Sequence, residues 1–286
     1  MSKPIRKTIL ITGASSGLGE GMAQQFAAMG RNLALCARRV DRLNELKAEL
    51  LQKHPGIRIE LRALDVNQHD QVFAVFNDFK QTFGTIDRVI VNAGLGKGQP
   101  IGKGRFDANL QTAQTNFIAA LAQCEAAVGI FREQKAGHLV TISSMSAMRG
   151  LPRNLTTYAA TKAGLAALTE GIRADLLKTP IKVSCIFPGY IETELSGKSA
   201  GKTPLMVDGE SGSRALVAAI EREPATALAP GALSRLRQAA AVRSGQSGAA
   251  FLQHALPRRR PCGLGERELP RQCSAGRRRR RCRRQA

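Results

Sequence analysis

The stretch TILITGASSGLG, residues 8–19, decides the fold. It joins a short apolar, β-branched run, Thr8–Thr12, to a glycine-rich turn and then to an amphipathic segment. Gly13 permits the tight turn, while Gly17 and Gly19 let the backbone approach a bound phosphate and let a helix pack closely on the strand. A helix that begins here also offers free N–H groups and a positive dipole to an anion. The pattern predicts a strand–turn–helix unit that binds a dinucleotide, with a plain Gly/Ser-rich turn as the alternative.

The alternation of strand and helix patterns continues along the chain. Further strands are predicted by the apolar runs at 32–37, 57–64, 89–91, 138–142 and 182–187. Helices are predicted at 18–29, 41–53, 72–79, 110–131, 156–177 and 213–222. Strands that are apolar throughout and alternate with helices indicate a parallel sheet covered on both faces. We therefore expect an α/β fold with a doubly wound, Rossmann-like parallel sheet, in one catalytic domain over residues 1–229. Ligands of such sheets bind at the carboxyl ends of the strands.

The C-terminal segment, residues 230–286, differs in composition from the rest of the chain. It holds 15 of the 43 basic residues and 2 of the 22 acidic ones, so it carries +13 of the formal net charge of +21. It contains no Lys, Asp, Asn, Ile, Met, Thr or Tyr. Such a segment buries too little apolar surface to offset its ordering entropy, so we expect a disordered tail. The missing residue types mostly have A/T-rich codons, which suggests an out-of-frame reading of G/C-rich DNA.

Composition also argues against several classes of protein. No apolar run approaches the ~18 residues of a membrane-spanning helix, and the apolar stretch after the basic N-terminus is too short for a signal peptide. We expect a cytoplasmic protein without a membrane span. Cys36, Cys124 and Cys185 have no metal-site spacing, so we expect no metal and interpret them as buried reduced thiols.

Two arginines follow the second predicted strand, where a dinucleotide fold meets the adenosine ribose. An acidic residue at this place bonds the ribose 2′-hydroxyl, whereas an arginine accommodates a 2′-phosphate. Arg38 and Arg39 have no acidic residue before them in the strand. The sequence therefore favours NADP(H) as the cofactor; a solvated arginine pair that opens a helix is the alternative.

Tyr158 and Lys162 stand four residues apart and share one face of a predicted helix. A free tyrosine has a pKa of about 10, which a neighbouring ammonium group would bring closer to neutrality. Ser143 and Ser144 end the preceding strand and can reach the same place, where a hydroxyl could steady charge that develops on a substrate oxygen. A Tyr–Lys pair alone is more often a surface pair, but a serine at the end of the strand before it makes an acid/base site the better interpretation.

Together these motifs resemble the short-chain dehydrogenase/reductase family, in its single-domain, NADP-preferring form. The resemblance runs from Thr8 to Arg222, with its elements in the family's order. It implies that Tyr158 is the acid/base at the carbonyl or alcohol oxygen and that Ser144 holds this oxygen. Lys162 would bind the nicotinamide ribose and lower the pKa of Tyr158. Asn116, in the long helix, would hold the helix and a water in a proton relay.

The resemblance also implies a cofactor site, a substrate side and an assembly. The implied NADP(H)-binding residues are Gly13, Ser15, Ser16, Gly17, Leu18, Gly19, Arg38, Arg39, Asp65, Val66, Asn92, Ala93, Gly94, Tyr158, Lys162, Pro188, Gly189, Ile191 and Thr193. The segments 95–106 and 190–208 would line the substrate side, for a small alcohol or carbonyl compound. A homo-oligomer, dimer or tetramer, is expected.

The chain departs from the family pattern in two places. Val91 stands where the family usually has a first asparagine before Asn92. Many members close with a seventh strand after the last helix, whereas here we expect the basic tail to follow directly and to leave a sheet edge open. Two other functions stay open beside the enzyme. One is a regulatory protein that binds the dinucleotide without turnover, and the other is binding of nucleic acid, without sequence choice, through the arginine-rich tail.

Overall fold

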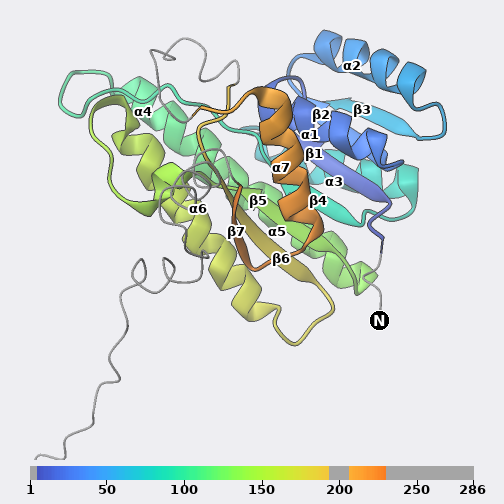
Figure 1. Ribbon diagram of the computed structural model, residues 1–286. Coiled ribbons are helices and arrows are strands. Elements are labelled where there is room, and N and C mark those ends of the chain that lie inside the picture. The colour runs from blue at the N-terminus through green and yellow to red at the C-terminus, as the bar shows by residue number, and fades with distance from the viewer. Residues whose placement is uncertain (1–4, 193–205, 230–286) are drawn as a thin grey trace, which may run out of the picture.

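The computed structural model describes residues 5–192 and 206–229. Strands and helices alternate along these residues (Figure 1). The strands are β1 (Thr8–Thr12), β2 (Asn32–Ala37), β3 (Ile59–Ala63), β4 (Arg88–Val91), β5 (His138–Ile142), β6 (Lys182–Pro188) and β7 (Thr226–Ala229). The α-helices are α1 (Gly17–Ala28), α2 (Val40–Lys53), α3 (His69–Phe83), α4 (Phe106–Ala113), α5 (Ala119–Gln134), α6 (Thr156–Asp175) and α7 (Gly209–Glu221).

The seven strands form one sheet in the order β3-β2-β1-β4-β5-β6-β7, and every neighbouring pair is parallel. The order reverses between β1 and β4, because the chain leaves β1 toward β2 and β3 and then returns to β4 on the other side. Loops that leave the carboxyl ends of β1 and β4 therefore diverge and open a crevice for a ligand. The expected α/β fold with a doubly wound parallel sheet is confirmed.

Two hydrophobic cores cover the two faces of this sheet. Side chains alternate along a strand, so Ile9 and Ile11 of β1 face one core and Leu10 faces the other. Helices α1, α2 and α7 pack on the first face, and α3, α5 and α6 pack on the second. Burial on both faces explains why the strands read as continuous apolar runs in the sequence.

Two elements differ from the sequence expectations. The helix predicted from Leu110 to Phe131 is two helices, α4 and α5, joined by a π-helical turn over Gln114–Ile118. The seventh strand, expected to be missing, is present: β7 pairs with β6 from Cys185 to Pro188. This four-residue strand leaves little sequence signal because only Ala229 in it is fully buried.

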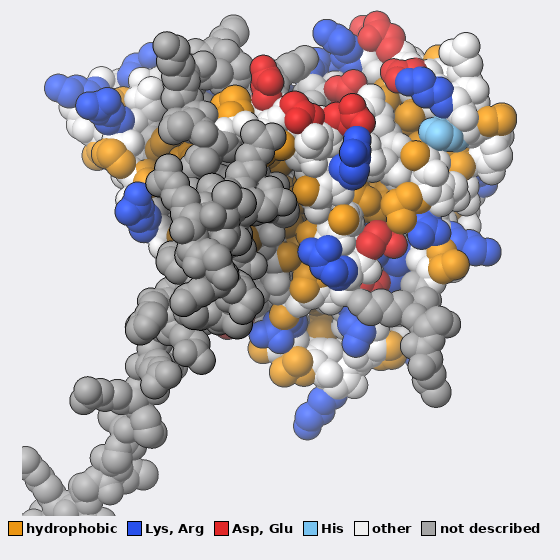
Figure 2. All heavy atoms as spheres, viewed as in Figure 1, with side chains coloured by type: hydrophobic (Ala, Val, Ile, Leu, Met, Phe, Trp, Pro, Cys, Tyr) orange, Lys and Arg blue, Asp and Glu red, His pale blue; other side chains and the backbone are white. Residues whose placement is uncertain are grey.

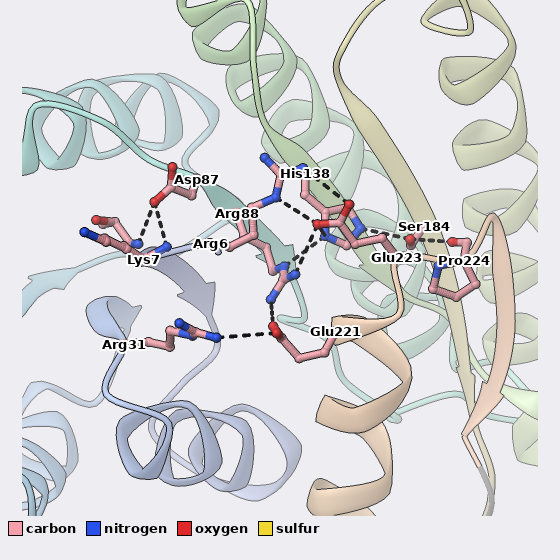
Figure 3. Close-up of polar contacts among 11 residues, drawn as sticks. Arg6, Lys7, Arg31, Asp87, Arg88, His138, Ser184, Glu221, Glu223 and Pro224 are labelled. Atoms are coloured by element: carbon pink, nitrogen blue, oxygen red, sulfur yellow. Dashed lines mark hydrogen bonds and ion pairs between the residues drawn. The ribbon is translucent and has the colours of Figure 1, made fainter. Parts of the chain in front are cut away.

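A buried network of charged groups lies at the amino ends of β4 and β5 (Figure 3). Arg88 is 1% exposed and pairs with Glu221, the last residue of α7, and with Glu223 in the segment that joins α7 to β7. Arg6, before β1, pairs with Glu223 at 2.8 Å. The Nε of Arg88 donates to Nδ1 of His138 at 2.9 Å, so the ring hydrogen lies on Nε2, which is 2.9 Å from the hydroxyl of Ser184. The network thus fastens the last described strand to the centre of the sheet.

Three further sequence expectations concern cysteines, membrane spans and the tail. Cys36, Cys124 and Cys185 are buried and free, as predicted. Within residues 5–192 and 206–229, no helix combines the length and the apolar character needed to cross a membrane. Residues 230–286, on which the disorder and reading-frame hypotheses rest, lie outside the described residues.

Candidate active site

The glycine turn after β1 makes a cradle that has no room for side chains. Gly13 has φ +66°, and a Cβ there would stand 2.9 Å from the Cα of Ala93. A Cβ on Gly19 would stand 2.3 Å from the carbonyl oxygen of Gly13. Gly17, the first residue of α1, also has a positive φ of 58°. The first turn of α1 therefore starts against the strand ends, where its free N–H groups can receive an anion.

Asn92 locks this turn to the end of β4. Its Nδ2 donates to the carbonyl oxygens of Thr12 and Gly13, at 2.9 and 3.3 Å. In return, the hydroxyl oxygen of Thr12 accepts the backbone N–H groups of Asn92 and Ala93, both at 3.1 Å. The sequence motif at 92–94 is thus brought beside the glycine motif, across the point where the strand order reverses.

The ends of β2 and β3 place the next predicted residues along the same edge. Arg38 and Arg39 are exposed after β2, and the Nε of Arg39 donates to the hydroxyl of Ser15 in the glycine turn at 3.3 Å. After β3, a side-chain oxygen of Asp65 accepts both the backbone and the side-chain N–H of Asn67, while Val66 is buried. The predicted cofactor residues of both strands therefore lie on the side of the glycine turn.

The end of β5 and the first turns of α6 bring Ser144, Tyr158 and Lys162 together. Ser144 forms a side-chain hydrogen bond with Tyr158, and its hydroxyl oxygen accepts the backbone N–H of Ser146 at 3.1 Å. Ser143 points elsewhere: it is buried and donates to the carbonyl oxygen of Lys162 at 2.8 Å. The two adjacent serines therefore have different tasks, one facing Tyr158 and one fastening α6 to β5.

Lys162 is buried beneath Tyr158. Its Nζ donates to the carbonyl oxygen of Ile142 at 2.8 Å and lies 5.9 Å from the centre of the Tyr158 ring. Burial lowers the pKa of Lys162 to about 8. A Cβ on Gly94 would stand 3.5 Å from this Nζ, so the absence of a side chain at Gly94 keeps the space above the lysine open.

The pKa of Tyr158 differs from the expectation. Burial raises the pKa of this phenol above its ordinary value, and its hydrogen bond with Ser144 is the contact that lowers it. Lys162 was expected to lower it, but its Nζ lies over the ring and is bonded to the end of β5. Near neutral pH the Tyr158 side chain is therefore a protonated phenol.

Asn116 lies in the π-helical turn and is fully buried. Its Oδ1 accepts the backbone N–H of Leu95 and its Nδ2 donates to the carbonyl oxygen of the same residue, both at 2.8 Å. Its Nδ2 also lies 3.4 Å from the hydroxyl of Thr161 in α6. Asn116 thus joins the segment after β4 to the helix that carries Tyr158.

Sequence reasoning missed a second asparagine, Asn109 of α4. Its Oδ1 accepts the backbone N–H of Gln99 at 2.9 Å and the hydroxyl of Thr157 at 3.0 Å. Gln99 belongs to the loop after β4, and Thr157 directly precedes Tyr158. No motif in the sequence marks Asn109, because its partners are one loop amide and a threonine in another helix.

The last predicted site residues follow β6. Pro188 ends the strand, and Ile191 is buried and pairs through an isolated bridge with Val207. Gly189 lies between them. Thr193, predicted to contact the nicotinamide amide, lies outside the described residues.

A parallel sheet with a glycine cradle at its strand reversal and a Ser–Tyr–Lys cluster on the same edge places the chain in the class of Rossmann-like proteins. Comparison with known proteins identifies the family. The family model described as short chain dehydrogenase matches residues 7–203. The chain belongs to this short-chain dehydrogenase/reductase family.

Individual relatives agree with this assignment. An uncharacterized oxidoreductase of Mycobacterium tuberculosis is 55% identical over 225 residues, which cover 79% of this chain and 88% of the relative. Among solved structures, a short-chain type dehydrogenase/reductase from Mycobacterium marinum is similar with a TM-score of 0.72 at 28% identity, over 79% of this chain and 94% of that one. An alcohol dehydrogenase from Thermococcus sibiricus, complexed with 5-hydroxy-NADP, is similar with a TM-score of 0.70 at 25% identity, over 78% and 94% of the two chains.

Proposed function

We propose that this protein is an NADP(H)-dependent oxidoreductase that transfers hydride between nicotinamide and the carbon of an alcohol or carbonyl group. One observation carries the proposal: Tyr158, hydrogen-bonded to Ser144, lies with Lys162 at the strand edge that also carries the glycine cradle. A proton donor and a dinucleotide site on one edge are the two parts that hydride transfer to a carbonyl requires.

The nicotinamide ring, when bound, supplies or accepts the hydride. The chain's own residues manage the proton and the oxygen. Ser144 holds the substrate oxygen with its hydroxyl, and Tyr158 gives its phenolic proton to that oxygen as negative charge develops there. Burial keeps Tyr158 protonated near neutral pH, which suits reduction of a carbonyl. Oxidation of an alcohol needs the phenolate, so its rate should rise with pH.

The residues present fit a phosphorylated dinucleotide. Side chains at Gly13 and Gly19 would fill the cradle, whose backbone and helix dipole suit a pyrophosphate. Arg38 and Arg39 are exposed beside the cradle, and guanidinium groups suit the 2′-phosphate that distinguishes NADP(H). The NADP analogue named for the Thermococcus sibiricus alcohol dehydrogenase supports the same choice.

Replacing Arg38 by Asp should reverse the cofactor preference. The carboxylate would repel the 2′-phosphate and could accept the 2′-hydroxyl of NADH, so we expect the NADPH/NADH ratio of kcat/KM to fall by at least about tenfold, the loss of roughly one charge-assisted bond. Arg42→Asp, in the first turn of α2 and paired with Glu45, makes the same charge change as a control and should leave the ratio near its starting value. A wild-type preference for NADH would refute the cofactor assignment.

Ser144 and Ser143 should respond differently to alanine. Ser144→Ala removes the group that faces Tyr158, so kcat should fall by about 10²-fold, while the melting temperature stays near that of the parent. Ser143→Ala removes the donor to the carbonyl oxygen of Lys162, so its main effect should be a lower melting temperature. Steady-state kinetics and thermal unfolding of both variants test the assignment. The opposite pattern would give the oxygen-holding role to Ser143.

A simple activity assay distinguishes this function from that of a regulatory dinucleotide-binding protein. Purified protein is mixed with NADPH and a panel of aldehydes and ketones, and loss of absorbance at the nicotinamide band is followed. Turnover that is lost when Tyr158 is replaced by Phe would favour the enzyme. Tight NADPH binding without turnover of any substrate would favour the regulatory alternative.

A further inference from the structure

We propose that the substrate of this site is a carbonyl compound with an apolar body and an anionic group, a carboxylate or a phosphate. The inference rests on the proposed function and concerns the rim of the same site. Two segments form one side of this rim: the loop after β4 with the first two residues of α4, residues 94–107, and the connection after β5 with the first two residues of α6, residues 145–157.

The two segments are one surface. Loop residue Gly98 packs so closely against the connection that a Cβ on it would stand 2.3 Å from the carbonyl oxygen of Asn154. Asn109 bonds to both, through the amide of Gln99 and the hydroxyl of Thr157. Because Thr157 adjoins Tyr158 and Ser144 directly precedes the connection, this surface borders the proposed proton donor.

This side of the rim is strongly basic. It contains five basic residues and one acidic residue, and that single carboxylate, on Asp107, is paired with the guanidinium of Arg105 at 3.2 Å. The other four basic residues are Lys97, Lys103, Arg149 and Arg153. Their side chains are exposed and form no ion pair with a residue that the structure describes. Cations gathered at the mouth of a site raise the local concentration of anions and favour an anionic ligand.

Apolar side chains stand exposed among these cations. Ile101 and Phe106 are 67% and 74% exposed on the loop side, and Met148 and Leu155 are 55% and 42% exposed on the other. Figure 2 shows basic and hydrophobic side chains side by side over α4 and the loop before it, at the upper left. Exposed apolar groups of this size beside a polar reaction centre provide contact area for an apolar chain or ring. A neutral polar substrate, such as a sugar, would be favoured neither by the basic side chains nor by the apolar ones.

The reaction itself stays as proposed above. With NADPH bound, the cofactor would supply the hydride to the carbonyl carbon. Tyr158 gives its proton to the carbonyl oxygen and regains a proton from water. The anionic group takes no part in the chemistry. It is held at the rim, so it should affect KM more than kcat.

The test compares a medium-chain aliphatic ω-oxo acid with its methyl ester, which has the same carbonyl and chain without the charge. We expect kcat/KM with NADPH to be at least tenfold higher for the acid, and this advantage to shrink as NaCl is raised from 20 to 300 mM, because salt screens exposed charges. Equal values for acid and ester, or a higher value for the ester, would overturn the proposal.

A double variant, Arg149→Gln with Arg153→Gln, tests whether the rim is responsible. It should lower the acid/ester ratio by about fivefold or more. Arg132→Gln, at the far end of α5, removes an exposed arginine away from the rim and should leave the ratio unchanged. If Arg132→Gln lowers the ratio as much as the double variant does, the effect belongs to net charge and the rim assignment is wrong.

Calorimetry of the protein–NADPH complex separates this proposal from the proposed function. Decanoate and 1-decanol are titrated as unreactive probes. Tighter binding of decanoate, without turnover of any carbonyl compound, would support the anionic rim and refute the enzyme. Turnover with equal binding of the two probes would support the enzyme and refute the rim.

Discussion

Replacing Tyr158 by Phe should lower kcat for carbonyl reduction by on the order of 10²–10⁴-fold, the contribution of a positioned proton donor. The change keeps the ring, which packs over Lys162, and removes only the hydroxyl that bonds to Ser144. Because the glycine cradle and Arg38 are untouched, the dissociation constant for NADPH should stay within about threefold. Steady-state kinetics and NADPH fluorescence measure the two quantities.

The chain contains one other tyrosine, Tyr190, which provides a matched control. It is 49% exposed after β6, so Tyr190→Phe makes the same chemical change outside the cluster with Ser144. We expect its effect on kcat to be far smaller than that of Tyr158→Phe. If Tyr158→Phe retains near-normal turnover while NADPH still binds, Tyr158 is not the proton donor.

The largest effect on stability is expected from Arg88→Met. Arg88 is 1% exposed and interacts with His138, Glu221 and Glu223. Its loss removes the buried cation at the centre of this network, after which Glu223 still pairs with Arg6 and Glu221 with Arg31. Removing one partner of a buried ion pair costs about 3–5 kcal/mol. The free energy of unfolding, measured with urea and circular dichroism, should fall by about this amount at pH 7. The proposed catalytic residues lie at the opposite ends of the strands, so the folded variant should keep its kcat.

Lys53→Met is the matched control, since it also replaces a cation by methionine in an ion pair. The pair of Lys53 with Glu49 is exposed, at 60% and 43%, and such pairs contribute about 1 kcal/mol or less. Similar losses in the two variants would show that the buried network contributes no more than a surface pair.

The parts of the fold that the sequence predicted are those with dense local signals. Residues 8–19 combine a strand run, glycines and a helix start, and the structure arranges them as predicted. Asn92 and Ala93 meet this turn, as the family's order of motifs implies. The distinct contacts of Ser143 and Ser144 could not be read from two identical adjacent residues.

Other features depend on contacts between distant segments and leave little local trace. Strand β7 is recognisable only through its pairing with β6, because two of its four residues are exposed. Asn109 bonds to partners 10 and 48 residues away. The sequence predicted a lowered pKa for Tyr158, but burial, which a sequence does not display, raises this pKa and outweighs the contact with Ser144.

The π-helical turn at Gln114–Ile118 constrains how this part of the chain can change in length. Its i→i+5 bond, from the N–H of Ala119 to the carbonyl oxygen of Gln114, accommodates one residue more than an α-helical turn does. Deleting one residue would restore a regular helix and rotate α4 against α5 by about 100°. Asn116 could then no longer face Leu95 while α5 keeps its packing on α3 and the sheet. A viable relative should therefore keep the extra residue. A one-residue gap at this point in an alignment would mark a chain whose loop after β4 is anchored in another way.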